Sequence, residues 1–258
     1  MLSYPAVTVQ DKAWQRPARV MAAESQPEQR NARASRSPLA DYFQLMRWTQ
    51  WSKNAVLFGA LIFSKHLFHL PSLLWASLGF LAFCATASGA YVFNDIRDCE
   101  RDRRHPLKAA RPLPSGRIPL RTAALLSAVL MLGGVGGAFL LGQDFGMLVL
   151  VYLLLQFAYT FFLKEVVILD VMAIATGFAI RAGAGGVVIG VPVSPWLIIC
   201  TFLLMLFLGF SKRRHELVLL EDRAVQHRTS LREYSPYFLD QMISVVTAST
   251  VVAYAIYT

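Results

Sequence analysis

Residues 73–102 read LLWASLGFLAFCATASGAYVFNDIRDCERD. The first part of this stretch is a run of apolar and small residues that continues to about residue 95. Such a run is long enough to cross the apolar core of a bilayer as a helix. It leads directly into three aspartates, Asp95, Asp98 and Asp102. We therefore expect a membrane-spanning helix that ends in an acidic segment.

Apolar runs of the same kind recur on both sides of this stretch. The chain has 258 residues, of which 55% are hydrophobic and 16% are charged, whereas soluble domains carry about 25% charged residues. This composition predicts an all-α polytopic membrane protein and excludes a disordered protein, a disulfide scaffold and a soluble nucleic-acid binder. We expect seven spans, at about residues 55–71, 73–95, 120–142, 146–163, 166–191, 195–211 and 237–257.

The formal net charge of +9 is unevenly distributed along the chain. Lys and Arg gather before the first span and in alternate loops, the distribution expected of cytoplasmic segments and not of a nucleic-acid surface. Residues 1–40 have no sustained apolar core, and we expect a disordered cytoplasmic tail there, followed by one transmembrane domain over residues 41–258. The N-terminus and any reaction site at the basic end of the helices are then cytoplasmic.

The acidic segment carries the strongest chemical signal. On a helix, Asp95, Asp98 and Asp102 fall within a sector of about 60°, with Asn94 at its edge. Carboxylates this close repel one another unless a cation joins them, and oxygen-only ligands suit Mg²⁺. We expect Asn94 and the three aspartates to hold a magnesium-diphosphate group. The alternative is a solvated helix end whose acids pair with nearby arginines, namely Arg97, Arg101, Arg103 and Arg104.

The next segment, residues 105–117, reads HPLKAARPLPSGR. An N-D-x-x-D-x-x-x-D motif followed by R-P-L-P-S-G resembles the UbiA superfamily of intramembrane prenyltransferases. The resemblance continues through Tyr159 and Lys164 and covers about residues 44–258. It implies a UbiA-like transmembrane helix bundle. Because that family usually has nine spans and about seven are found here, we expect a domain shortened at its C-terminal end.

The loop after the sixth expected span indicates the branch of the superfamily. Most members carry a second aspartate-rich motif there, whereas residues 211–217 read SKRRHEL. Cations beside a diphosphate site suit a second phosphorylated substrate. Together with RWTQWSKN at 47–54 and RAGAGG at 181–186, this loop resembles the branch that transfers phosphoribose to decaprenyl-type phosphates.

The resemblance implies Mg²⁺-dependent transfer of 5-phosphoribose from phosphoribosyl pyrophosphate to a polyprenyl phosphate in the bilayer, with release of pyrophosphate. It places the enzyme in the inner membrane of a bacterium, leaves a homo-oligomer open, and implies a product used in cell-wall biosynthesis. The catalytic residues implied are Asp95, Asp98, Asp102, Lys53 and Lys108. Further substrate contacts are expected from Asn54, Asn94, Arg111, Tyr159, Lys164, Arg181, Lys212, Arg213 and Glu216.

Several alternatives stay open at this point. A UbiA-type enzyme could instead move a prenyl chain from a prenyl diphosphate to an aromatic acceptor, and the missing second aspartate motif counts against it. A transporter or a lipid-binding protein would explain the spans but not the aligned aspartates, and a shortened bundle could be inactive. Arg181, inside the fifth expected span, faces either a phosphate or a partner on another helix, because an arginine facing lipid is costly.

Overall fold

The computed structural model describes residues 38–104, 108–220 and 234–257. Nearly all of the expected N-terminal tail, and His105 and Pro106 of the matched motif, lie outside the described residues. The chain divides into two compact units, Met1–Tyr42 and Phe43–Thr258. The second unit contains all of the expected spans.

The fold is all-helical, as predicted. Within the described residues, six helices are long and apolar enough to cross a membrane. They are α4 (Leu70–Arg103), α5 (Leu120–Leu141), α6 (Gln143–Phe161), α7 (Leu169–Val188), α8 (Pro195–Leu220) and α10 (Pro236–Tyr257). Each coincides with one of the expected spans, and α4 continues past its apolar part so that the acidic segment forms its last turns.

The first expected span, at 55–71, takes a different form. After the short helix α2 (Pro38–Leu45), the structure has the 3₁₀ helix η2 (Trp48–Phe58) and the helix α3 (Gly59–Phe63), followed by a turn in which Lys65 has a φ of 62°. At about 2.0 Å per residue for a 3₁₀ helix and 1.5 Å for an α-helix, η2 and α3 together extend about 30 Å.

The composite of η2 and α3 has a polar part and an apolar part. The first turns of η2, up to Asn54, precede the apolar run that begins at Ala55, so Lys53 lies outside the expected span. The composite lies where the first span is expected, and the six long helices found within the described residues are roughly consistent with the expected number of about seven.

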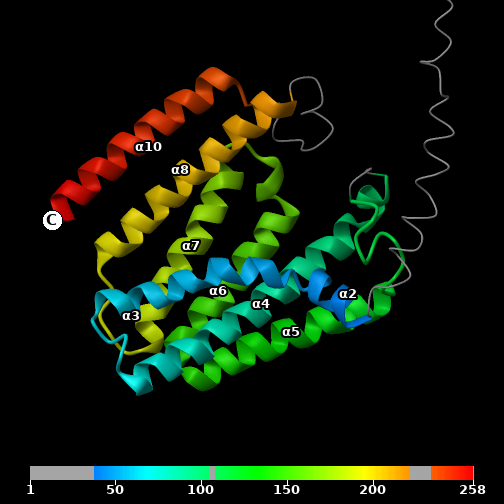
Figure 1. Ribbon diagram of the computed structural model, residues 1–258, viewed down its shortest axis with the longest axis horizontal. Helices are drawn as coiled ribbons and strands as arrows, with labels where there is room; N and C mark the ends of the chain where they lie inside the picture. The colour runs from blue at the N-terminus through cyan, green and yellow to red at the C-terminus, as the bar shows by residue number, and fades with distance from the viewer. Residues whose placement is uncertain (1–37, 105–107, 221–233, 258) are drawn as a thin grey trace, which may run out of the picture. The chain divides into compact units, whose positions relative to one another are not determined.

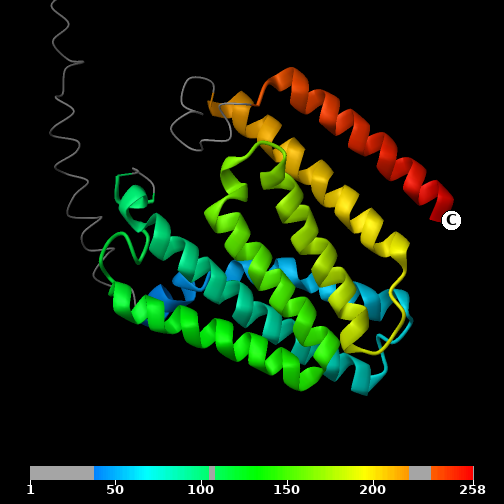
Figure 2. The same ribbon diagram turned by 180° about the vertical axis from the view of Figure 1, so that it is seen from behind.

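The helices pack in two groups that share α7. Helix α4 packs against α5, α6, α7 and η2, whereas α8 packs between α7 and α10 (Figure 1 and Figure 2). The first group buries a core around Phe83, Phe145 and Tyr152. The second group buries Val171, Phe210 and other apolar side chains of α7, α8 and α10.

Glycines allow two close backbone approaches within the first group. A Cβ at Gly185 of α7 would lie 2.0 Å from the carbonyl oxygen of Leu57, so η2 can lie against α7 only because this side chain is absent. A Cβ at Gly134 of α5 would lie 2.3 Å from the hydroxyl of Thr86 on α4. At these two positions the absence of a side chain lets neighbouring helices pack closely.

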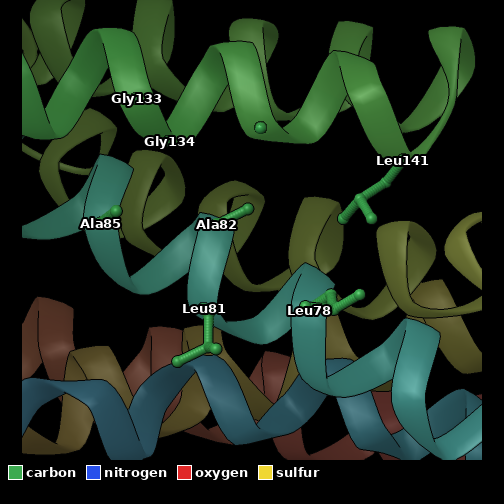
Figure 3. A pocket seen from close by; sticks show the side chains of 8 residues that line it. Leu78, Leu81, Ala82, Ala85, Gly133, Gly134 and Leu141 are labelled. Carbon is green, nitrogen blue, oxygen red and sulfur yellow. The ribbon is translucent and has the colours of Figure 1, made fainter.

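Glycines of α5, Gly134 among them, line an apolar hollow between α4 and α5 (Figure 3). Its volume is about 270 Å³. It is lined by Leu78, Leu81, Ala82, Ala85, Gly133, Gly134, Gly137 and Leu141. This lining carries no polar side chain, so the hollow offers no group that could bind a charged phosphate.

Charged residues gather where α4, α6 and α8 end and where η2, α7 and α10 begin. Within the described residues, this end of the bundle holds the three aspartates and most of the cations that the sequence points to. The arrangement follows from the alternation of the spans, which returns the basic connections to the same side.

Candidate functional site at the end of helix α4

Asp95 and Asp102 form one side of an acidic site on the last turns of α4. Arg111 Nη1 lies 3.0 Å from Asp102 Oδ2 and 3.7 Å from Asp95 Oδ1, so a single cationic nitrogen lies between the two carboxylates. Lys108 Nζ lies 3.5 Å from Asp102 Oδ1, and Arg47 also pairs with Asp95 through its Nη2. Both aspartates are buried. Their negative charge is therefore held by cations from the segments on either side of α4.

Asp98 and Asn94 form the other side of the acidic site. Lys164, in the short 3₁₀ helix η3 (Leu163–Glu165), places Nζ 2.9 and 3.0 Å from the two carboxylate oxygens of Asp98. The same ammonium donates to Asn94 Oδ1 at 3.3 Å. Lys164 thus links the end of α6 to the acidic segment of α4.

The donor set of the acidic site fits a hard divalent cation. All four expected ligands offer oxygen atoms, and Mg²⁺ usually takes one or two carboxylates and completes its shell with water and phosphate. Within the described residues no three His, Cys, Asp or Glu side chains are grouped closely enough to hold a metal ion. The carboxylates are paired with side-chain cations instead, and a divalent ion at the same positions would be attracted by the same negative charge.

A second polar cluster lies deeper in the bundle, around Arg181. This residue of α7 is 3% exposed. Its Nε donates to Asn54 Oδ1 and its Nη2 to the hydroxyl of Tyr152, both at 2.7 Å. Asn54 in turn donates to Cys84 Sγ at 3.2 Å. The contacts of Arg181 therefore join η2, α6 and α7, which is the interhelical alternative raised by the sequence.

The partners of Arg181 are neutral, although a buried guanidinium is stabilised most by an anion. No carboxylate lies within 4.0 Å of it in the described part of the chain. The side chain of Lys53, next to Asn54, makes no hydrogen bond or ion pair with any described residue. Partial desolvation of its ammonium, together with the positive charges of Arg181, Lys212 and Arg47, lowers the pKa of Lys53 below its ordinary value, although the residue is exposed at the surface. This side of the bundle is thus a cationic region with few anions to balance it.

The expected substrate contacts on α8 divide into two kinds. Lys212, in the last three turns of α8, is 72% exposed, and its ammonium makes only a long contact of 3.9 Å with Glu216 Oε1. Arg213 points inward: its Nε lies 3.0 Å from Asp170 Oδ2, and its Nη1 lies 2.9 Å from Glu216 Oε2. Contact between Arg213 and a substrate stays a prediction, and in this structure its guanidinium belongs to a buried ion pair.

Tyr159, the last of the expected contacts, lies partly buried near the end of α6. The sequence pattern did not reveal the roles of Arg47, Tyr152, Asp170 and Tyr234. Arg47 begins the RWTQWSKN stretch, but its pairing with Asp95 crosses 48 positions. The sequence offers one signal for the network around Arg213: Asp170 is an acid inside an expected membrane span.

Comparisons with known proteins agree with the fold. The sequence matches the UbiA prenyltransferase family over residues 55–258. The decaprenyl-phosphate phosphoribosyltransferase of Corynebacterium glutamicum is 32% identical over 224 residues, which cover 85% of this chain and 68% of that protein. The protein of the same name from Mycolicibacterium smegmatis is 31% identical over 241 residues, covering 92% of this chain and 75% of that protein.

A solved structure supports the same fold. The UbiA homolog from Archaeoglobus fulgidus, determined with GPP and Mg²⁺, superimposes with a TM-score of 0.69 at 20% identity, covering 83% of this chain and 76% of that one. At this identity the likeness concerns the fold alone. The sequence match and the shared helix bundle together show that the chain belongs to the UbiA prenyltransferase family, a family of membrane transferases.

Proposed function

We propose that this transferase moves the 5-phosphoribosyl group from phosphoribosyl pyrophosphate to a polyprenyl phosphate of the decaprenyl type and releases pyrophosphate. The observation that carries the proposal is the presence of two separate regions suited to anions. One is the acidic site with its surrounding cations, and the other is the cationic region of Lys53, Arg181 and Lys212. A reaction between two phosphorylated substrates needs both.

The acidic site suits the pyrophosphate of the donor. Asp95, Asp98 and Asp102, with Asn94, would hold Mg²⁺, which when bound offsets the negative charge of the departing pyrophosphate. Lys108, Arg111 and Lys164 already lie within 4.0 Å of these carboxylates. From there their nitrogen atoms can donate to phosphate oxygens while the carboxylates hold the metal.

The cationic region suits the phosphate of the acceptor. Arg181 is buried among neutral partners and Lys53 has no partner within the described residues, so an added phosphate monoester would balance charge that the protein leaves uncompensated. Lys212, in the last three turns of α8, contributes a third positive charge. The polyprenyl chain of such an acceptor would extend into the bilayer beside the helices.

The chemistry required of the protein is then mainly positioning. An oxygen of the acceptor phosphate attacks C1 of the ribose, the bond from C1 to the pyrophosphate oxygen breaks, and the bonding electrons leave with the pyrophosphate. A phosphate monoester is already anionic at neutral pH, so no strong general base is needed. The cations hold the two anions in contact against their repulsion.

The same proposal includes the location of the protein. Because Lys and Arg are concentrated at the end of the bundle that holds the acidic site, we place that end on the cytoplasmic side of a bacterial inner membrane. Phosphoribosyl pyrophosphate is a soluble, highly charged metabolite, which fits a site open to the cytoplasm.

Two donors tested in parallel distinguish this function from its nearest rival. Purified protein in detergent with Mg²⁺ is supplied either with ribose-labelled phosphoribosyl pyrophosphate and a polyprenyl phosphate, or with a labelled prenyl diphosphate and an aromatic acid. We expect label to reach the lipid phase in the first mixture and to be lost with Asp98→Ala. Prenylation of the aromatic acid without transfer in the first mixture would replace the proposal with aromatic prenyl transfer.

A further inference from the structure

The connection between η3 and α7 contains a strained residue. Ile168 has a φ of 69° and a ψ of −50°, and the N–H of Leu169 donates to the carbonyl oxygen of Val167 at 2.8 Å. These angles and this hydrogen bond define a γ-turn of the rare kind with positive φ. A β-branched side chain is particularly unfavourable there. Such a turn persists only where its surroundings hold it in place.

Tyr234 holds this turn from a distant part of the chain. Its hydroxyl accepts the N–H of Ile168 at 2.7 Å and donates to Asp170 Oδ1 at 2.8 Å. The other oxygen of Asp170 accepts from Arg213 Nε at 3.0 Å. Asp170, Arg213 and Tyr234 are all at least 95% buried. Burial also raises the pKa of Tyr234, so the phenol keeps the proton that it donates to Asp170.

The turn is close in sequence to a residue of the acidic site. Lys164 lies four positions before Ile168, in η3, and its ammonium contacts both oxygens of Asp98. The side chains of Val167 and Ile168 pack against the apolar cluster of α7, α8 and α10. One end of this short connection is thus fixed by Tyr234, and the other end carries Lys164.

We propose that Tyr234, Asp170 and Arg213 are positioning residues for Lys164: they hold the strained turn at Ile168, and the turn sets where the Lys164 ammonium stands beside Asp98. In this role the three residues act through the turn, at Ile168, and not on the pyrophosphate directly. The proposal rests on the proposed function only in that Lys164 must act on a pyrophosphate group. It assigns a role in the reaction to a tyrosine that lies just before α10, far from the acidic motif in sequence.

The experiment compares single and double variants of the full-length protein in detergent. Tyr234→Phe removes only the hydroxyl, and Tyr237→Phe is its matched control because Tyr237 is 74% exposed. The measurement is the affinity for pyrophosphate with Mg²⁺, by titration calorimetry. We expect Tyr234→Phe and Lys164→Gln each to weaken binding by about tenfold, the size of one charged hydrogen bond. We expect Tyr237→Phe to bind as the wild type does.

The double variant shows whether Tyr234 acts through Lys164. If it does, Tyr234→Phe combined with Lys164→Gln binds pyrophosphate no more weakly than Lys164→Gln alone. A glycine tolerates positive φ, so Ile168→Gly should restore most of the affinity that Tyr234→Phe loses. Wild-type affinity in Tyr234→Phe would overturn the proposal. So would losses that multiply in the double variant, or a loss explained by a lower melting temperature.

The pyrophosphate readout separates this proposal from the proposed function. If phosphoribosyl transfer is not observed but the variants behave as described, the positioning role stands and the substrate assignment fails. If transfer is observed and Tyr234→Phe leaves both pyrophosphate affinity and kcat/KM unchanged, the positioning role fails alone.

Discussion

Lys164 and Asp98 form a two-point ion pair, with Nζ 2.9 and 3.0 Å from the carboxylate oxygens, across 66 positions of sequence. The pair joins α4 to the connection between α6 and α7. It also means that the protein itself supplies a cation to the Asp98 carboxylate. A divalent ion and a diphosphate binding together would supply partners for both members of the pair, since the carboxylate can turn to the metal and the ammonium to a phosphate oxygen.

A first prediction concerns the metal dependence of the acidic site. Asp98→Asn and Asp102→Asn each remove an anionic ligand without changing size. We expect each to raise the Mg²⁺ concentration for half-maximal transfer by at least about tenfold, which corresponds to about 1.4 kcal/mol. Mg²⁺ titrations of the transfer rate provide the measurement.

Glu100→Gln is the control for these variants. Glu100 lies on the same turns of α4, but its side chain is 74% exposed and pairs with Arg103 at 2.6 Å. We expect its Mg²⁺ requirement to match that of the wild type. An equal increase in all three variants would mean that net charge, and not ligation, determines the metal requirement.

A second prediction follows from the lowered pKa of Lys53. An acceptor phosphate binds the ammonium form, so its affinity is full below this pKa and falls as the pH rises through it. The KM for the polyprenyl phosphate should therefore begin to rise at a pH below the ordinary range for lysine. Lys53→Arg keeps its charge at these pH values and should show a flat profile. The same pH profile in both proteins would remove Lys53 from the acceptor site.

A third prediction concerns the buried cluster around Arg181. Tyr152→Phe removes the hydroxyl that accepts from Arg181 Nη2 at 2.7 Å. A buried donor left without a partner costs about 1–3 kcal/mol, so we expect a lower melting temperature in detergent. Tyr257→Phe, at a half-exposed tyrosine of α10, should melt as the wild type does. An unchanged melting temperature in Tyr152→Phe would show that Arg181 does not depend on this contact.

A fourth prediction tests the close approach of η2 to α7. A side chain at Gly185 would collide with the backbone of Leu57, whereas a Cβ at Gly133 of α5 meets nothing within 4 Å. We expect Gly185→Ala to reduce folded yield sharply. Gly133→Ala should be neutral or stabilising by up to about 1 kcal/mol, since alanine favours a helix over glycine. Size-exclusion profiles and melting curves in detergent compare the two. Similar behaviour of both variants would contradict the close contact of η2 with α7.

The sequence was sufficient for the parts of the structure that depend on helical periodicity. The run before Asn94 predicts α4, and the spacing of Asp95, Asp98 and Asp102 places them on one sector of its end. The apolar pattern at 55–71, in contrast, does not distinguish a continuous α-helix from the 3₁₀ segment found there. Apolar composition reports burial in the membrane but not the hydrogen-bond pattern of the backbone.

Pairings between distant segments were beyond the reach of the sequence. Lys164 and Asp98 were both expected at the site, but nothing in either segment indicates that they touch. Asp170 resembles an ordinary acid in the first turn of a helix, and Tyr234 follows residues with no apolar pattern. Only the packing of α7, α8 and α10 brings these two side chains into contact.

In the proposed reaction, the bond between ribose C1 and pyrophosphate is the one that breaks, and a donor labelled in two places shows whether it does. Phosphoribosyl pyrophosphate would carry one isotope in the ribose and another in the terminal pyrophosphate phosphorus, with a polyprenyl phosphate as acceptor. We predict that the ribose label moves to the lipid phase while the pyrophosphate label stays in water as pyrophosphate. Both labels in the lipid phase, or neither while a prenyl diphosphate is consumed, would contradict the account.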